Sequence, residues 1–564
     1  MSLDIDRRTF SKGALLISIS GIAAACRPLL PPPPPLVVAG DIVDIHCHLF
    51  NGQDLPVVRF ITKVVIPENE TPEPRIAASR AVEDPSVLEL VLQWFKDRLL
   101  HETPTAEQEI AYLKGEASLR SNATAAGAPD FAVSTLADVI QGRPPDGVGP
   151  RLAPDARSER FRTLLLDAAA QSGTMSLNRA APRAEPDPRE AALAAYESQS
   201  TIGVYLRWFT LFMQYRHSLA EQLTSALTND GRKPVLLVPL MIDYSKWLGE
   251  SVASSLRDQV EVFDLIARGR QASPAIHGMV AYDPLRAVYH QRRPDLQAED
   301  PLSIVEDALE SHGFLGVKLY PPMGFRAAGN TDGQGYPDLV AEELRGVAGL
   351  GRDLDDALDR LYGLCTRIEA PVIAHAAATQ GAGRGYADRA DPTYWLRVLK
   401  RWPGLRLCLA HQGRFGYRSL APETAGQIYE DIIGRHISEN PDTHLCMDIS
   451  YLSEALRPGA ENRKYYADSL KAWIGRYDRN AEHILFGTDW IMVGIEKAGA
   501  AYTRNVIWFL TEDCGLSADQ LDRILRLNAG RYLGLRDGDA TRRRLLEGFY
   551  SVNQMPETLL PPFA

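Results

Sequence analysis

Cysteine is scarce in this sequence. Only 6 cysteines occur in 564 residues, at positions 26, 47, 365, 408, 446 and 514. So few and so widely spaced, they exclude the dense disulfide framework of a small secreted domain. Cys47, Cys408 and Cys446 lie inside short apolar segments, which predicts that they are small buried core residues.

An excess of positive charge is also lacking. The formal net charge is −11 and the isoelectric point is about 5.7. The chain has no dense lysine or arginine run, no zinc-finger spacing and no P-loop. A mildly acidic chain gives no support for a phosphate-backbone partner. We therefore expect a small-molecule substrate and no nucleic acid, while the sequence carries no signal for the oligomeric state.

Long hydrophobic runs are absent as well. The apolar run 13–25 is shorter than the roughly 20 residues that span a bilayer. It follows Arg7-Arg8 with Phe10 and Lys12, a pattern that resembles a twin-arginine export signal. The run therefore predicts a signal segment at residues 1–26.

The end of that segment, Ala23-Ala24-Ala25-Cys26, resembles a bacterial lipobox. This predicts lipidation of Cys26, the alternative being ordinary cleavage near Ala25. Five consecutive prolines at 31–35 favour an extended spacer within a 27–40 linker. We expect an exported protein, periplasmic or anchored as a lipoprotein, that meets the membrane only through this lipid.

The rest of the chain alternates short apolar runs with helical patterns. Helices are expected at 353–368 and at 391–400, the second with Asp391 as N-cap and Pro392 in the first turn. Alternating strands and helices indicate a parallel sheet, and eight strands fit a closed (β/α)₈ TIM-like barrel over 41–536. The runs expected as strands are 41–48, 234–241, 276–282, 316–320, 371–375, 405–411, 444–449 and 483–489.

About 180 residues, 51–232, separate the first two expected strands. We expect a mostly helical insertion there, with helices starting at Asp84-Pro85 and Thr103-Pro104, a long helix over 188–227 and loop-like structure over 120–190. The apolar stretch 202–213 is expected as a buried helix. An insertion after the first strand leaves from the mouth of a barrel, which predicts a cap over the substrate pocket, or else an outgrowth without a catalytic role. Residues 537–564 are a C-terminal extension.

Polar side chains end several of the apolar runs. His46 and His48 are two apart on the first strand and therefore face the same side. His375, His411 and Asp489 each close a later run. Burying such groups is costly unless they are paired or bind a metal. Together they predict a metal site at the carboxyl ends of the strands.

Imidazole and carboxylate ligands suit Zn²⁺, one or two ions, and also Mn²⁺, Fe²⁺ or Ni²⁺. A bound metal lowers the pKa of its water to about 7 and makes hydroxide available at neutral pH. Asp489 is expected to serve as both ligand and proton shuttle, so Asp489 and His411 are the candidate catalytic residues.

This pattern resembles the amidohydrolase superfamily and, within it, the amidohydrolase 2 group of metal-dependent hydrolases. The resemblance rests on His46/His48, His375, His411 and Asp489, on Gly487-Thr488-Asp489-Trp490 and on 524–535, and covers about 41–50 and 233–536. It implies a metal-dependent hydrolase of an amide, ester or lactone, or of a phosphoester. The alternatives are a zinc-dependent non-oxidative decarboxylase and a non-catalytic exported binding protein.

Lys318 ends the fourth expected strand. In relatives of this superfamily a lysine at that place is carboxylated and bridges two metals. The resemblance thus implies two ions, one held by His46, His48 and Asp489 and one by His375 and His411. A free Lys318 ammonium would leave one ion, with His375 joining it and His411 orienting water or substrate; a purely structural lysine is the third reading.

Tyr320 and Arg414 are the candidate substrate contacts. Tyr320 follows Lys318 by two residues and Arg414 follows His411 by three. Either side chain could hold a carboxylate or carbonyl group. The sequence does not identify the substrate.

Overall fold

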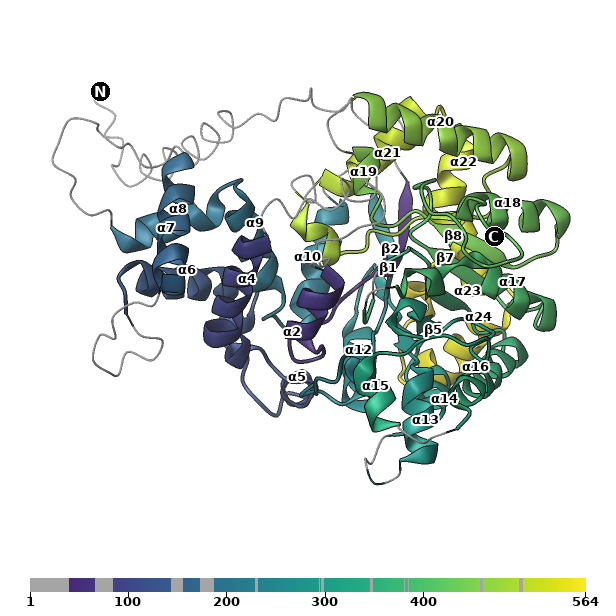
Figure 1. Ribbon diagram of the computed structural model, residues 1–564, viewed down its shortest axis with the longest axis horizontal. Coiled ribbons are helices and arrows are strands. Elements are labelled where there is room, and N and C mark those ends of the chain that lie inside the picture. The colour runs from purple at the N-terminus through teal and green to yellow at the C-terminus, as the bar shows by residue number, and fades with distance from the viewer. Residues whose placement is uncertain are drawn as a thin grey trace, which may run out of the picture.

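Parallel strands and surrounding helices form the larger part of the molecule, and a group of helices lies beside it (Figure 1). This computed structural model describes residues 40–65, 85–143, 156–172, 187–228, 232–293, 295, 299–344, 348–379, 381–383, 385–456, 460–496 and 501–563. The expected α/β architecture with parallel strands is thereby confirmed for the described residues.

Two sheets contain all the named strands, and every pairing in them is parallel. One sheet has the order β1-β2-β3 and the other the order β4-β5-β6-β7-β8-β9. Each of the eight expected runs contains a strand. The bounds are β1 Asp41–Cys47, β2 Lys233–Pro239, β3 Ala275–Ile276, β4 Met279–Ala281, β5 Gly316–Leu319, β6 Val372–His375, β7 Leu407–Ala410, β8 Leu445–Asp448 and β9 Ile484–Leu485.

The third expected strand is split in two at His277 and Gly278. The backbone there changes partner: His277 N donates to Leu237 O, whereas Gly278 O accepts from Leu315 N. The His277 side chain lies within hydrogen-bond distance of the Tyr550 hydroxyl, 2.9 Å away. The break follows from these side-chain and backbone contacts, so the apolar pattern of 276–282 does not reveal it.

Hydrogen bonds also link the two sheets at both of their edges. A parallel bridge joins Leu240 after β2 to Met279 at the start of β4. At the other edge Cys47 of β1 bridges to Trp490, and Ile45 N donates to Phe486 O over 3.2 Å. The strand ends of both sheets therefore lie side by side.

Helices that lie between the strands and after the last strand surround the sheets (Figure 1). Asp391 accepts from Thr393 N and Pro392 opens the next helix, as expected from the sequence. These helices are α11 Ser245–Leu248, α12 Leu256–Gly269, α13 Pro284–Arg292, α14 Pro301–Ser311, α15 Asp338–Glu343, α16 Leu350–Arg367, α17 Pro392–Arg401, α18 Tyr429–Glu439, α19 Ser453–Leu456, α20 Ala460–Tyr477, α21 Tyr502–Trp508, α22 Ala518–Asp522, α23 Asn528–Leu533 and α24 Ala540–Arg544.

The insertion is helical, as expected, but its interior differs from the prediction. The expected long helix over 188–227 is wrong: it is three helices, broken where the Ser200 side chain caps a new start. The prediction of loop-like structure over 120–190 is wrong for α6, Gly127–Ile140, and α7, Ala156–Gln171. In both, the high helix propensity of alanine and leucine exceeds the opposing effect of proline and aspartate. The helices are α2 Val57–Phe60, α4 Pro85–Trp94, α5 Ala106–Leu113, α6 Gly127–Ile140, α7 Ala156–Gln171, α8 Pro188–Glu197, α9 Thr201–Leu211 and α10 Arg216–Thr228.

One predicted cap in the insertion is also wrong. Helix α5 begins after Thr105 and not after Thr103, because Thr105 and Gln108 form a reciprocal capping box. The expected buried helix around 202–213 is confirmed by α9, whose Trp208 and Phe209 are buried. Phe212 follows directly and packs against Phe50, 5.7 Å between ring centroids.

Cys47, Cys408 and Cys446 are buried and unpaired, which confirms the core prediction. Cys26, the signal segment and most of the linker lie outside the described residues. None of the helices in the described part of the chain is long and apolar enough to cross a membrane.

Candidate metal centre

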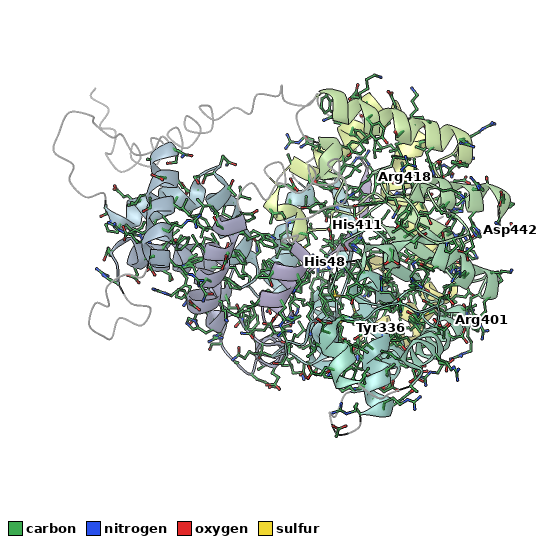
Figure 2. All side chains as sticks on the ribbon, viewed as in Figure 1. His48, Tyr336, Arg401, His411, Arg418 and Asp442 are labelled. Atoms are coloured by element: carbon green, nitrogen blue, oxygen red, sulfur yellow. The ribbon has the colours of Figure 1, made fainter. Side chains whose placement is uncertain are left out.

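The residues singled out at the strand ends are buried and come together, and Figure 2 labels two of them, His48 and His411. His46 lies within β1 and His48 just after it, His375 ends β6, and His411 follows β7. Their rings are close: the centroids of His46 and His411 are 4.6 Å apart, as are those of His375 and His411. Each of these four side chains, and those of Lys318 and Asp489, is at most 7% exposed.

His46, His48 and Asp489 form the first group that could hold a metal ion. Asp489 Oδ1 lies 3.5 Å from His46 Nε2 and 3.1 Å from His48 Nε2. Four ligands at about 2.1 Å from a tetrahedral ion are about 3.4 Å from each other. The three donors are thus spaced as ligands of one divalent ion.

In each ring, the contact made by Nδ1 determines whether Nε2, the nitrogen near Asp489, carries a proton. His48 Nδ1 lies 3.0 Å from the carbonyl oxygen of Leu240, which can only accept, so Nδ1 carries the proton. His46 Nε2 is buried and has no hydrogen-bond partner in the described part of the chain. Burial, followed by the positive charge of Lys318, lowers the pKa of His46 well below its usual value. A neutral ring with an unused nitrogen fits a metal ligand.

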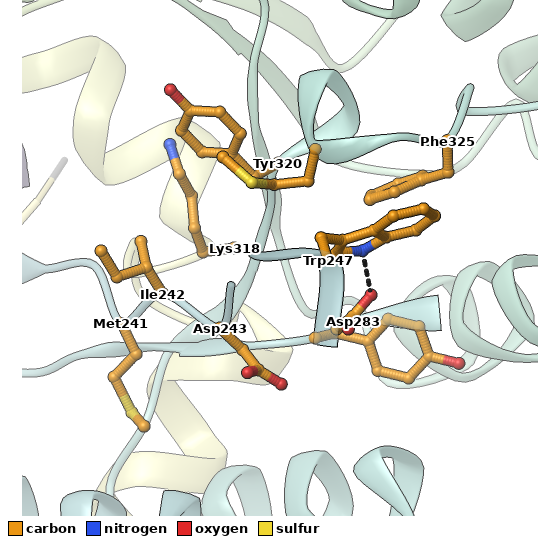
Figure 3. Close-up of a pocket in the computed structure, with 10 residues that line it drawn as sticks. Met241, Ile242, Asp243, Trp247, Asp283, Lys318, Tyr320 and Phe325 are labelled. Carbon is orange, nitrogen blue, oxygen red and sulfur yellow. Dashed lines mark hydrogen bonds between the residues drawn. The ribbon is translucent and has the colours of Figure 1, made fainter. Parts of the chain in front are cut away.

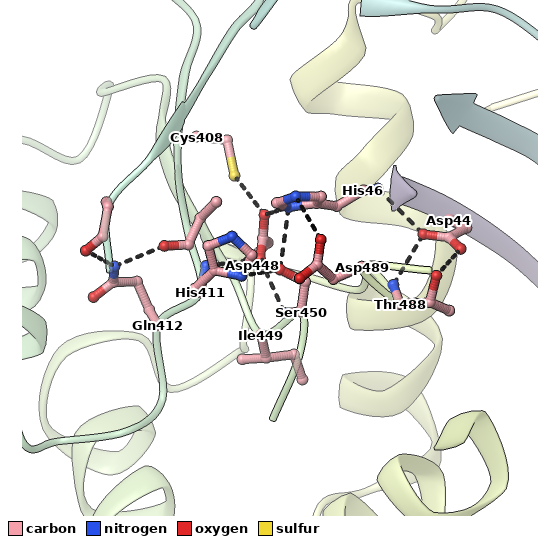
Figure 4. Close-up of polar contacts among 12 residues, drawn as sticks. Asp44, His46, Cys408, His411, Gln412, Asp448, Ile449, Ser450, Thr488 and Asp489 are labelled. Atoms are coloured by element: carbon pink, nitrogen blue, oxygen red, sulfur yellow. Dashed lines mark hydrogen bonds and ion pairs between the residues drawn. The ribbon is translucent and has the colours of Figure 1, made fainter. Parts of the chain in front are cut away.

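A second group, His46, His411 and Asp448, shares His46 with the first (Figure 4). His46 Nδ1 is 2.9 Å from Asp448 Oδ2. Ser450 Oγ lies 2.5 Å from Asp448 Oδ1, 2.9 Å from His411 Nδ1 and 3.1 Å from His46 Nδ1. The hydroxyl therefore sits among all three members of this group, where an ion would have to lie.

Sequence analysis missed Asp448 and Ser450. The signal was present, since Asp448 lies next to the end of the seventh expected run, 444–449, just as Asp489 closes the eighth. Its role depends on Ser450, two residues further on, and on contacts with residues hundreds of positions away. Spacing along the chain does not report such contacts.

His375 belongs to neither group. Its Nε2 lies 3.2 Å from the Thr379 hydroxyl, and its ring stacks on Tyr320 with centroids 4.0 Å apart. Burial, and then the neighbouring His411, lower the pKa of His375 well below its usual value. The structure brings His375 beside the first group without placing a donor atom in it.

Lys318 reaches the same region from β5. Its ammonium is buried and has no hydrogen-bond partner among the described residues. Burial lowers its pKa to about 8, against the attraction of Asp448 and Asp489. Lys318 and Tyr320 also line a pocket in which Trp247 stacks near Phe325 and donates to Asp283 (Figure 3).

The backbone carrying the ligands is held in an uncommon conformation. His411 and Asp489 have φ values of 64° and 55°, in the left-handed region that non-glycine residues seldom adopt. Asp44 supports the second of them by accepting from Thr488 N over 3.1 Å and from Thr488 Oγ1 over 2.6 Å. Burial raises the pKa of Asp44 to about 7 despite these hydrogen bonds.

The two predicted substrate contacts lie near the site. Tyr320 meets Tyr244 edge to face, 4.9 Å between centroids. Arg414 donates to the Tyr417 hydroxyl and to Tyr451 O, each over 2.9 Å. Its charge contributes to the lowered pKa of both His375 and His411, which places it beside the histidines.

Tyr244 is a further residue that sequence analysis missed. Burial raises its pKa well above the usual value, and Tyr320 and Asp489 add to the effect. It also stacks on Phe60 of the insertion, 5.6 Å between centroids. Tyr244 therefore joins the insertion to the edge of the ligand group.

The comparisons with known proteins point to one family. Residues 293–535 match the model of the amidohydrolase family described as Amidohydro_2. No curated protein matches the chain. The match contains β5 to β9, and with them Lys318, His375, His411, Asp448 and Asp489.

Two solved structures are similar to the chain at low identity. A protein from Pseudomonas putida, provisionally described as a 2-pyrone-4,6-dicarboxylic acid hydrolase, is 16% identical with a TM-score of 0.31, covering 56% of this chain and 86% of its own. A protein from Lactobacillus casei ATCC 334, provisionally described as a metal-dependent hydrolase, is 13% identical with a TM-score of 0.33, covering 73% of this chain and 92% of its own. Scores this low carry no argument about this chain.

Proposed function

We propose that the chain is a metal-dependent hydrolase of an amide, ester or lactone bond, acting at the site of His46, His48 and Asp489, because residues 293–535 match the model of the amidohydrolase family. One observation carries the proposal: three buried donor atoms lie within 4.8 Å of one another, with Asp489 Oδ1 at 3.5 and 3.1 Å from the two imidazole nitrogens. A divalent metal bound there supplies a Lewis acid and makes a water ligand acidic at neutral pH. Zn²⁺ suits two imidazoles and a carboxylate best.

The chain's own groups divide the remaining work. Asp489 Oδ1 faces the two imidazoles, and we assign the carboxylate of Asp489 as the base that would take the proton of an attacking water. Lys318 provides a positive charge beside this carboxylate. Tyr320 and Arg414 lie around the histidines and would orient a carbonyl or carboxylate of the substrate.

We infer one ion per chain, because His46, His48 and Asp489 bring three donor atoms together, whereas Ser450 Oγ lies among the members of the second group. A second ion would need His375 to give up its contact with Thr379. Metal content of the full-length protein, by elemental analysis after exhaustive dialysis, tests this. About one ion per chain is expected; about two ions, falling to one in Lys318→Met, would establish a bridging, carboxylated Lys318 instead.

Decarboxylation is the second candidate, favoured by the buried Lys318 ammonium beside a one-ion site. The two reactions separate in one assay. Zinc-loaded protein is incubated with a panel of lactones, esters, amides and aromatic acids, and both carbon dioxide and new carboxylate are measured. Carboxylate without carbon dioxide supports hydrolysis, whereas carbon dioxide release supports the lyase.

We also propose that the two sheets close into one eight-stranded barrel, with β3 and β4 counted as a single interrupted strand. The bridges at both edges support it. Amide hydrogen exchange tests it: Ile45, Asp489 and Met241, which donate across the edges, are expected to exchange as slowly as the amides within β6 and β7. Fast exchange at these three amides would argue for open edges.

The export signal and a lipid on Cys26 remain proposals from the sequence. Mass spectrometry of the mature N-terminus tests them together. A diacylated peptide beginning at Cys26 is expected, and an unmodified terminus elsewhere would contradict it.

A further inference from the structure

A buried carboxylate behind the candidate metal centre has no place in the chemistry proposed above. Asp448 ends β8 and is 0% exposed. Its oxygens face only donors: His411 N and Ser450 N, at 3.0 and 2.9 Å from Oδ1, and His46 Nδ1, at 2.9 Å from Oδ2. A carboxylate with this surrounding is an acceptor for each of them.

The proton positions around Asp448 follow from counting donors. Oδ2 accepts, so the proton of a neutral His46 ring is on Nδ1, which leaves Nε2 unprotonated. Ser450 has a single hydroxyl proton, and its shortest contact is with Asp448 Oδ1. Ser450 Oγ must therefore accept from His411 Nδ1, which leaves Nε2 of His411 unprotonated as well.

We propose that Asp448 is a positioning residue that fixes the tautomers of His46 directly and of His411 through Ser450, so that His46 turns an unprotonated Nε2 toward the metal site and His411 keeps its own Nε2 unprotonated. The proposal rests on the metal-dependent function proposed above. It assigns the second cluster of His46, His411 and Asp448 to orientation and not to a second ion, because Ser450 Oγ occupies its centre.

Asp448→Asn is the decisive variant, because it keeps the shape of the side chain and replaces one accepting oxygen with an amide nitrogen that donates. The amide oxygen can still accept from His411 N, Ser450 N and the Ser450 hydroxyl. The amide nitrogen then faces His46 Nδ1, which has to accept and moves its proton to Nε2. An Nε2 that carries a proton cannot bind the metal.

The matched control is Asp391→Asn. Asp391 is also 0% exposed and accepts from Thr393 N, the Ser419 hydroxyl and Leu420 N, so none of these partners is a histidine. It undergoes the same chemical change at the same burial. Any loss common to both variants is a cost of burying an amide in place of a carboxylate.

Two measurements on full-length, metal-free protein test the proposal. Long-range ¹H–¹⁵N spectra of ¹⁵N-histidine-labelled protein report which nitrogen of each ring is protonated. Titration with Zn²⁺ against a chromophoric chelator reports affinity. We expect the His46 signal to change from the Nδ1–H to the Nε2–H form in Asp448→Asn, with Zn²⁺ affinity lower by 10- to 100-fold, the usual effect of losing such a partner. Asp391→Asn is expected to leave both readouts unchanged.

Ser450→Ala provides a second test if Asp448→Asn does not fold. It removes the acceptor of His411 Nδ1 only, so the His411 signal is expected to change and that of His46 to stay. An unchanged His46 tautomer together with Zn²⁺ affinity within twofold of wild type in Asp448→Asn would overturn the proposal. Wild-type protein that binds no Zn²⁺ would instead refute the proposed function, and the tautomer spectra would still decide the role of Asp448.

Discussion

Two buried clusters of charged side chains differ in whether they are complete. In the junction cluster, Arg216 of α10 pairs through its two terminal nitrogens with Asp54 and with Glu109 of α5. All three side chains are at most 3% exposed, and they tie α5 and α10 of the insertion to its first segment, just after β1. In the metal centre, His46 Nε2 and Lys318 Nζ have no hydrogen-bond partner in the described part of the chain. In the junction cluster each charged group has a partner of opposite charge, and we call it complete although Arg216 Nε lacks a hydrogen-bond partner among the described residues. The metal centre is incomplete, because it leaves a buried ammonium and an imidazole nitrogen unpaired, and a ligand could satisfy them.

The largest effect is expected at the incomplete cluster. Asp489→Asn removes a charged donor, so we expect activity to be lost and Zn²⁺ affinity to fall by more than about 100-fold, beyond the loss of an outer partner. Thermal unfolding of the metal-free protein should change little. Asp478→Asn is the control, since Asp478 caps the opposite end of β9 by accepting from His483 N. Equal loss of affinity in both variants would contradict the assignment.

The complete cluster should respond in stability instead. Arg216→Met leaves two buried carboxylates unpaired, which predicts a loss of about 3–5 kcal/mol in the free energy of unfolding. Urea denaturation of the metal-free protein measures it. Arg257→Met, at a half-exposed pair with Glu299 and Asp307, should cost less than about 1 kcal/mol. A similar small loss at Arg216 would mean that packing and not charge holds the insertion.

A bound metal should raise the free energy of unfolding of the protein, and this increment should depend on the metal centre and not on the junction cluster. Zn²⁺ at about 100 times its dissociation constant is expected to add about 2.7 kcal/mol to the stability of wild-type protein. The same increment should appear in Arg216→Met, because its metal centre is intact, and should vanish in Asp489→Asn. Differential scanning calorimetry with and without Zn²⁺ makes the comparison. An increment that Arg216→Met abolishes would show that the two clusters are coupled.

A pH-dependence separates the clusters further. Burial raises the pKa of Glu109 to about 7, against the attraction of Arg216 and with Asp54 adding to the rise. The folded state then holds a proton that the unfolded state has lost, so stability falls as the pH rises from about 4.5 to about 7. The slope from this group is at most about 1.4 kcal/mol per pH unit. Glu109→Gln should flatten the stability profile in that window, and an unchanged profile would refute the assignment.

The smallest effect is expected where the insertion contacts the segment that follows Asp489. Trp208 of α9 donates through Nε1 to Ile491 O over 3.1 Å, two residues after Asp489. Trp208→Phe should lower stability by about 1 kcal/mol and kcat several-fold, with KM less affected. Trp395→Phe is the control, a buried indole whose Nε1 has no hydrogen-bond partner among the described residues. Equal changes in kcat would leave the insertion without a positioning role.

The sequence by itself determined the alternation of strands and helices and the placement of polar residues at the strand ends. Parallel strands bring their carboxyl ends to one edge, so His46, His48, His411 and Asp489 could be expected together without coordinates. Local chemistry also determined Asp391 as a helix cap, because its partners are the next residues along the chain.

Only the tertiary structure decided the partners of those residues. The contact of Asp448 with His46 spans 402 positions. The hydroxyl of Thr379 lies within hydrogen-bond distance of His375 Nε2, a contact that the apolar pattern of the sequence does not predict. The same holds for Arg216, whose pairing with Asp54 and Glu109 depends on residues 162 and 107 positions away. Periodicity along a chain reports which side a residue faces, whereas hydrogen bonding and burial depend on what the fold places opposite.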